Sequence, residues 1–268
     1  MDVTLLGTMG WMPRGDRETT CFAVRTGSSL LLFDAGTGLR RLLDPEHAHL
    51  LDGAAEVHLF LSHYHLDHVC GLAYLSGVLP GRDVVMHPPG EALTGVDPLA
   101  AVAGLVRRPY NPVDLAQMKR VRVEPTREGE NVVAGHVVRV RPQQHTDTSV
   151  SFRLDDDLVI ATDTQVDPAA ADFAAGAGLW LHEAWYWSDD PGLATVPEEL
   201  RPGFAAHSEA TGVAGLAAKA GVGRLILVHL NPLAGESSFL PMRDAARAVF
   251  PRTDVVADGT AVPASASV

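Results

Sequence analysis

The chain has 268 residues, of which 46% are hydrophobic and 20% charged, and its formal net charge is −12 with the histidines counted as neutral. This composition is that of a folded globular protein, and it excludes intrinsic disorder and collagen-like structure. The acidic balance argues against nonspecific binding to nucleic acid or to a membrane surface, because both need a basic face. Cys21 and Cys70 are the only cysteines, which excludes a disulfide framework and argues against a metal site built from cysteine.

The N-terminus has no basic stretch followed by an apolar segment, and the longest apolar runs are far shorter than a membrane span. We therefore expect neither a signal peptide nor a transmembrane helix, and a cytoplasmic location is the default expectation. No low-complexity linker divides the sequence, so we expect a single domain over residues 1–268.

Runs rich in β-branched and apolar residues, bounded by glycine and proline, open the chain. They predict strands at 3–6, 20–25, 30–34, 57–62 and 84–87. Between these strands, the spacing of apolar residues predicts helices at 36–43 and 69–78. Residues 88–119 contain five prolines and predict an irregular segment with one helix around 99–106, which could form a lid.

The second half of the chain predicts further strands at 121–124, 136–142, 149–154, 158–162, 179–183 and 224–229. The clearest helix is predicted over 208–220, with Ser208 as its N-cap and Gly221 just past its end. A last helix is predicted over 241–250, and the Ala/Ser/Pro tail after Asp258 is expected to fray. Strand-rich halves punctuated by helices, without regular βαβα alternation, indicate an α/β domain with a layered sheet core.

The sharpest local signal is the sequence His63-Tyr64-His65-Leu66-Asp67-His68. Imidazole nitrogens and a carboxylate suit zinc and its neighbours among the first-row metals. The first two histidines follow a predicted strand and, being two residues apart in extended backbone, point the same way. The aspartate and the last histidine lie at the turn into the next helix and can face a second position. Four such side chains, with ligands from elsewhere, exceed what one tetrahedral ion needs, so we expect two ions. A solvated polar loop is the alternative.

Further ligand-type residues stand at other predicted strand ends, namely His145, Asp163 and His229. Each alone would be interpreted as a capping or surface residue. As a set beside the histidine-rich loop, they indicate a metal site on one edge of the sheets. Six other histidines, His47, His49, His58, His87, His136 and His182, are interpreted as structural or surface residues.

From Leu6-Gly7-Thr8 to His229, the chain resembles the metallo-β-lactamase-fold hydrolases. The resemblance implies a four-layer αββα sandwich with a dinuclear metal site on one sheet edge. It implies that His63, His65 and His145 hold one ion, that Asp67, His68 and His229 hold the other, and that Asp163 bridges them. The ions implied are two divalent cations, zinc in the first place, with manganese or iron left open.

Three stretches resemble the ribonuclease Z and cyclic-phosphodiesterase branch: Leu6-Gly7-Thr8 with Thr19-Thr20-Cys21, His182-Glu183-Ala184, and His207-Ser208 before a helix. In that branch a glutamate, a histidine and the motif aspartate form a proton-handling relay, here Glu183, His207 and Asp67. Transfer-RNA-processing members carry a long exosite arm between the third histidine and the bridging aspartate. Only 17 residues separate His145 from Asp163 here, which, with the acidic charge, argues against long RNA as substrate.

The resemblance implies hydrolysis of a small phosphodiester, such as a cyclic phosphate, by a hydroxide that bridges the two ions. Hydrolysis of an ester, lactone or thioester in a biosynthetic pathway stays open, because one fold serves both chemistries. A non-catalytic metal-binding partner protein is a third alternative. Trp11, Tyr110 and Trp185 are candidate substrate contacts, with core packing as the alternative. The expected partner is a small molecule rather than long nucleic acid or a membrane, and a homodimer stays open.

Overall fold

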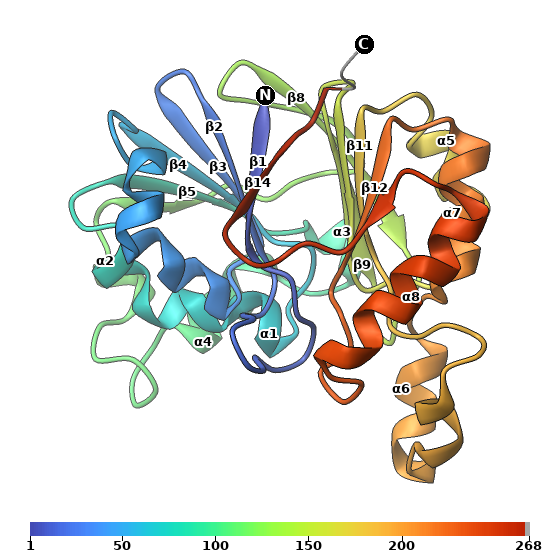
Figure 1. The fold of residues 1–268 in the computed structure, drawn as a ribbon. Coiled ribbons are helices and arrows are strands. Elements are labelled where there is room, and N and C mark those ends of the chain that lie inside the picture. The colour runs from blue at the N-terminus through green and yellow to red at the C-terminus, as the bar shows by residue number, and fades with distance from the viewer. Residues whose placement is uncertain (266–268) are drawn as a thin grey trace.

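Two mixed sheets of seven strands each face one another in the computed structural model, which describes residues 1–265 except for the side-chain surroundings of residues 192 and 195 (Figure 1). Helices pack on the outer face of each sheet. The expected αββα sandwich is therefore confirmed. None of the described helices combines the length and the apolar character needed to cross a membrane.

The first sheet combines the N-terminal strands with one strand from the C-terminal tail. Its order is β14 (Thr260–Pro263), β1 (Asp2–Gly7), β2 (Cys21–Thr26), β3 (Ser29–Phe33), β4 (Glu56–Phe60), β5 (Asp83–His87) and β6 (Val121–Val123). The pairs from β14 to β3 are antiparallel, and those from β3 to β6 are parallel.

The second sheet is built from the other half of the chain. Its order is β13 (Thr253–Asp254), β12 (Arg224–Val228), β11 (Leu179–Glu183), β10 (Leu158–Ala161), β9 (Ser149–Leu154), β8 (His136–Gln143) and β7 (Gly129–Val133). The pairs from β10 to β13 are parallel, and those from β7 to β10 are antiparallel.

The longest of the described helices lie in the second half of the chain. The α-helices are α1 (Leu66–Val69), α2 (Leu75–Val78), α3 (Glu91–Thr94), α4 (Pro98–Leu105), α5 (Ala170–Phe173), α6 (Arg201–Ala205), α7 (Ala210–Ala220) and α8 (Glu236–Val249). Turns of 3₁₀ helix occupy Thr37–Leu43, Pro45–Leu50, Cys70–Tyr74, Leu115–Gln117, Pro191–Thr195 and Glu198–Leu200.

Three apolar clusters hold the four layers together. In β3, Leu30 and Leu32 face the helices of the first half, whereas Leu31 and Phe33 face the second sheet. This alternation follows from the two-residue period of a strand buried on both faces. Between the sheets, the ring of Phe33 stacks on Phe60 with centroids 5.1 Å apart. The third cluster joins the second sheet to α5, α7 and α8.

The prediction of a frayed tail after Asp258 was wrong within the described residues. β14 pairs with β1, from Asp2 opposite Pro263 to Leu5 opposite Thr260, and Val262 is buried. The Ala/Ser/Pro composition hides this strand because a single large apolar residue carries it. Residues 266–268 of the predicted tail lie outside the described residues.

Three helix predictions also need correction. The helix predicted over 69–78 is three short turns, because the N–H of Gly71 bonds the carbonyl of Ala35 rather than the preceding turn. The helix predicted from 241 begins at Glu236, and Pro241 lies inside it, where it removes one backbone hydrogen bond. Ser208 is not the N-cap of α7, since the side chain of Glu209 accepts the N–H of Gly212 in that role.

The segment 88–119 is more ordered than its prolines suggest, with α3, α4 and a 3₁₀ turn. Its role as a lid stays a prediction.

Candidate metal centre

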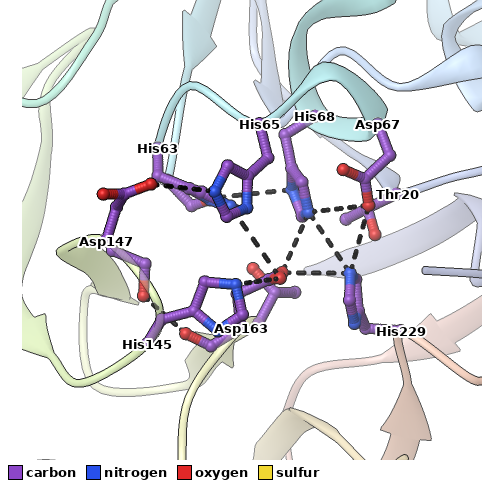
Figure 2. Close-up of polar contacts among 12 residues, drawn as sticks. Thr20, His63, His65, Asp67, His68, His145, Asp147, Asp163 and His229 are labelled. Carbon is purple, nitrogen blue, oxygen red and sulfur yellow. Dashed lines mark hydrogen bonds and ion pairs between the residues drawn. The ribbon is translucent and has the colours of Figure 1, made fainter. Parts of the chain in front are cut away.

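The residues expected as metal ligands meet at one edge of the two sheets. The loop after β4 carries His63 and His65 into α1, which contributes Asp67 and His68. The other three follow the ends of strands in the second sheet: His145 after β8, Asp163 after β10 and His229 after β12. Figure 2 shows the imidazole rings arranged around the carboxylate of Asp163.

The seven side chains fall into two groups. His63, His65, His145 and Asp163 offer ligand atoms within 4.8 Å of one another, and so do Asp67, His68 and His229. This division is the one that the sequence resemblance implies. A third combination, Asp163 with His207 and His229, also meets the same distance.

The carboxylate of Asp163 lies between the two groups. Its Oδ2 is 2.9 Å from Nε2 of His68 and 3.0 Å from Nε2 of His229. Its Oδ1 is 3.2 Å from Nε2 of His145 and 3.8 Å from Nε2 of His63. One oxygen thus faces each group, which is the arrangement that a bridging carboxylate needs.

Two of the histidines use the ring nitrogen that points away from the centre to donate a hydrogen bond. The acceptors lie in connections that follow strands of the second sheet. Nε2 of His65 lies 3.1 Å from the carboxylate of Asp147, and Nδ1 of His145 lies 3.1 Å from the carbonyl of Ala206. These bonds leave Nδ1 of His65 and Nε2 of His145 with a free lone pair toward the centre. Such outer contacts fix the tautomer and orientation of metal-binding histidines.

Asp34 organises the other side of the centre. Its carboxylate accepts the N–H and the hydroxyl of Ser62 at 2.7 and 2.9 Å, and Nδ1 of His68 at 2.8 Å. Because the hydroxyl of Ser62 donates to Asp34, it accepts from Nδ1 of His63 at 3.0 Å. His63 and His68 therefore both turn Nε2 toward the centre.

The inward-facing atoms are short of hydrogen bonds. Nε2 of His63 is buried and makes no hydrogen bond within the described part of the chain, and Oδ2 of Asp163 faces the ring nitrogens of His68 and His229. Buried polar atoms are normally paired, so atoms that converge without pairing indicate a missing ligand. Neutral imidazoles and carboxylates are the donors that zinc and related ions take. The two groups therefore fit a dinuclear metal site.

Burial and charge act in opposite directions on the carboxylates. Burial alone would raise the pKa of Asp163, but the neighbouring His229, His68 and His63 hold it well below its usual range. The pKa of Asp67 is likewise low, because His68 and His229 outweigh the effect of burial. Both groups are therefore ionised, as metal ligands must be.

Burial and charge also act in opposite directions on the pKa values of the histidines, and which effect is larger differs among them. Burial lowers the pKa of His63 and of His145. Burial would lower the pKa of His68 and His229 too, but the nearby carboxylates raise it by more. The pKa of His68 is therefore well above its usual value, and that of His229 rises to about 10. Without an ion, these two rings thus carry the positive charge that the carboxylates require.

Glu183 and His207 form a pair beside the second group. The carboxylate of Glu183, fully buried at the end of β11, accepts Nδ1 of His207 at 2.7 Å and the N–H of Thr164 at 2.7 Å. Its Oε2 also lies 3.4 Å from Nδ1 of His229. Burial would raise the pKa of Glu183, but His207 and His229 lower it to about 2. The ring of Trp185 stacks on His207, with centroids 4.1 Å apart.

Asp67 joins this pair only indirectly among the contacts of the described residues. Its Oδ2 lies 3.3 Å from Nε2 of His229, whose other nitrogen faces Glu183. The same oxygen accepts the backbone N–H of Trp11 at 2.7 Å.

Several site residues hold a left-handed backbone. Trp11, Asp34, Asp163 and His229 have φ between 48° and 60°, a region that residues other than glycine rarely adopt. Such strain persists where the surrounding structure holds it, and it is concentrated at functional sites.

A cavity of about 480 Å³ opens over the centre. It is lined by Trp11, His65, Leu66, Asp67, His145, Thr146, Asp163, Trp185, Leu200, Gly203, Phe204, His207, His229 and Leu233. Two of the three aromatic residues expected as substrate contacts, Trp11 and Trp185, thus border it. Tyr110 does not line this cavity, and it is 76% exposed.

The sequence did not single out the residues that orient the expected ligands, namely Asp34, Ser62, Asp147 and the carbonyl of Ala206. Asp34 ends a predicted strand and Asp147 stands two residues after His145, so both carried a positional signal. The carbonyl of Ala206 carried none, because a backbone group leaves no trace in the sequence.

Comparison with known proteins agrees with the geometry. Residues 30–230 match the profile of a family described as the Beta-lactamase superfamily domain. A ribonuclease Z of Mycobacterium sp. (strain KMS) is 32% identical over 270 residues, which cover 94% of this chain and 92% of that protein.

Solved structures share the fold. The metallo-β-lactamase fold protein YhfI from Bacillus subtilis superposes with a TM-score of 0.75 at 19% identity, over 97% of this chain and 98% of YhfI. A diphosphatase from the PhnP family superposes with a TM-score of 0.67 at 14% identity, over 98% of this chain and 97% of that one. The chain belongs to the metallo-β-lactamase superfamily and is distantly related, at 27–32% identity, to ribonuclease Z over nearly its full length.

Proposed function

We propose that this protein is a metal-dependent phosphodiesterase that acts on a small substrate. The observation that carries the proposal is the Glu183–His207 pair beside a centre of two ligand groups. Because Nδ1 of His207 is bound to Glu183, its Nε2 is the nitrogen left to face a substrate in the cavity. Distant relatives named ribonuclease Z support phosphodiester chemistry.

When bound, two divalent ions would lower the pKa of a water between them and supply hydroxide near neutral pH. The chain's own residues do the rest. Glu183 orients His207 through its bond to Nδ1, so that Nε2 faces the leaving oxygen and can donate a proton to it. Trp185 fixes the plane of the imidazole by stacking.

Long RNA does not suit this site. β9 and β10 form an antiparallel hairpin between His145 and Asp163, in the place where an exosite arm would extend. Of the described residues that line the cavity, none is lysine or arginine, the side chains that bind phosphate backbones. A substrate with one phosphodiester needs no such track.

Hydrolysis of an ester, lactone or thioester is the second candidate. The apolar walls of the cavity, such as Leu66, Phe204 and Leu233, favour it, because an acyl substrate brings no charge. The His207–Glu183 pair can protonate the alkoxide that leaves in either reaction, so the relatives named ribonuclease Z are what favours the phosphodiester.

One experiment separates these candidates. Elemental analysis of the purified protein identifies the metal, for which we propose zinc, with manganese and iron as the alternatives. Turnover is then measured on bis(p-nitrophenyl) phosphate, a cyclic nucleotide, a lactone and a thioester, before and after chelation. We expect phosphodiester hydrolysis that chelation abolishes and added metal restores. Hydrolysis of the acyl substrates alone would reject the proposal, and a metal-loaded but inert protein would favour a binding role.

A further inference from the structure

We propose that the substrate is an unsymmetrical phosphodiester. Its leaving alcohol carries a flat, uncharged apolar group, and its retained substituent carries hydroxyl or amide groups. This inference rests on the proposed phosphodiesterase function and adds which end of the substrate lies where and which bond breaks.

The cavity over the centre has a rim of apolar side chains, whose contact with water is unfavourable. Trp11, Leu66 and Leu233 line it and remain 49%, 65% and 44% exposed. Phe204 and Leu200 face it from the segment that carries α6, which projects from the body of the molecule at the lower right of Figure 1. Clustered exposed apolar side chains mark a binding surface, whereas isolated ones need no explanation.

A second, polar groove adjoins the apolar cavity. It has a volume of about 630 Å³ and is bordered by Tyr64, His65, Thr94, Val96, Gln143, Gln144, His145, Thr146, Asp147, Thr148 and Gln165. His65, His145 and Thr146 border both spaces, so a substrate held at the centre reaches into each. Amides, hydroxyls and the carboxylate of Asp147, without lysine or arginine among the described lining residues, suit an uncharged group with hydroxyls to donate, such as a polyol or sugar.

The position of His207 decides which of the two substituents on phosphorus leaves. His207 and the stacked Trp185 line the apolar cavity and are not among the residues bordering the polar groove. The group that donates the proton therefore faces the apolar substituent. It follows that the apolar alcohol leaves and that the polar substituent stays on phosphorus.

The step balances without a further reactant. A water-derived hydroxide forms a new P–O bond, the P–O bond to the apolar alcohol breaks, and the proton on Nε2 of His207 goes to the departing oxygen. The products are an apolar alcohol and a phosphate monoester of the polar alcohol. The proton released by the water restores His207.

The test uses benzyl glyceryl phosphate, whose two alcohols are both unactivated. We expect the metal-loaded protein to release benzyl alcohol and glycerol phosphate, which phosphorus NMR distinguishes from glycerol and benzyl phosphate. Trp11→Ala and Phe204→Ala should each lower kcat/KM for this diester about tenfold, as expected for loss of one aromatic contact, and lower kcat/KM for methyl glyceryl phosphate by a smaller factor. Leu240→Ala, which removes an exposed side chain of α8 outside the cavity, is the matched control.

A binding measurement gives a readout that does not depend on turnover. Benzylphosphonate has no ester bond, and calorimetry should show that it binds more tightly than methylphosphonate to the unmodified protein and to Leu240→Ala, with the difference lost in Trp11→Ala. Release of glycerol, an equal mixture of products, or unchanged kinetics in Trp11→Ala would overturn this inference while leaving the proposed function intact. Failure to cleave any diester would instead reject the proposed function.

Discussion

The outer contacts of the histidines decide which nitrogen can bind an ion. His65 would bind through Nδ1, because Asp147 takes its Nε2, whereas His63, His68 and His145 would bind through Nε2. The centre is therefore organised by residues that never touch the ion. The effect of these residues on metal binding can be tested by substitution, like that of the expected ligands.

Asp147 offers the cleanest test of such an outer contact, because its side chain is 79% exposed and its removal leaves the core intact. We expect Asp147→Ala to weaken metal binding tenfold to about a hundredfold, since His65 loses the acceptor that orients it. Competition with a chromogenic chelator measures the affinity. Asp172→Ala, at an exposed position on α5, is the control and should bind metal like the unmodified protein. Equal affinities in the two variants would show that Asp147 plays no part.

His207 is expected to act on the substrate and not on the metal. His207→Ala should lower kcat by a factor of about 100 to 10,000, the usual contribution of a general acid, with metal content unchanged by elemental analysis. A fall in metal content would show instead that the third combination, Asp163 with His207 and His229, is the one that binds an ion.

At the residue scale, the sequence indicated the side chains that face the centre, but not the residues that orient them through hydrogen bonds. The ligand-type residues stand out because histidine and aspartate at successive strand ends are chemically conspicuous. Tyr110 is an aromatic residue of the segment 88–119, and its sequence context does not indicate that it lies outside the cavity.

At the scale of elements, the central strands were predictable and the edges were not. β3 and β12 are continuous apolar runs, because both of their faces are buried. β7 was missed because only Val133 of this edge strand is buried. The short strands β13 and β14 depend on pairing with distant segments, which local sequence does not encode.

The loop after β1 packs against the end of β12 at Gly10. A Cβ placed there would lie 2.4 Å from Cε1 of His229, so Gly10→Ala must displace that ring. We expect a loss of about 1–3 kcal/mol in the free energy of unfolding, as for other overpacked sites, together with weaker metal binding. Urea denaturation and chelator competition measure the two effects. Gly215→Ala, where an added Cβ meets no atom within 4 Å, should show neither loss.

At the scale of the whole molecule, the centre joins the two sheets. His63, His65, Asp67 and His68 follow β4 in the first sheet, and His145, Asp163 and His229 follow strands of the second. A junction within the first sheet lies near β14, where Asp258 accepts the hydroxyl of Thr8 at 2.7 Å and the N–H of Glu18 at 2.6 Å, both from the loop after β1.

Asp258 makes the stability of this junction depend on pH. Burial raises its pKa to about 6, although hydrogen bonds and two arginines oppose this. The unfolded chain loses the same proton near pH 4 (about 3.9). Between these values the folded state binds more protons, so the contribution of Asp258 to the free energy of unfolding falls as pH rises, by up to about 3 kcal/mol.

Comparison with Asp258→Asn isolates this effect. Relative to the unmodified protein, the variant should gain stability between pH 4 and pH 7, as measured by urea denaturation at both values. A constant difference between the two proteins would mean that Asp258 is ionised throughout this range in the folded state.

The place of β14 also bears on how the protein is made. A ribosome delivers β1 first, yet the neighbour that completes its outer edge, β14, emerges only after β12 and α8. The first sheet therefore exposes one strand edge until β14 has emerged. His229 likewise emerges 161 residues after His68, with which it shares one of the two groups. Nascent chains should thus be the form most dependent on chaperones, and metal loading should follow synthesis instead of guiding it.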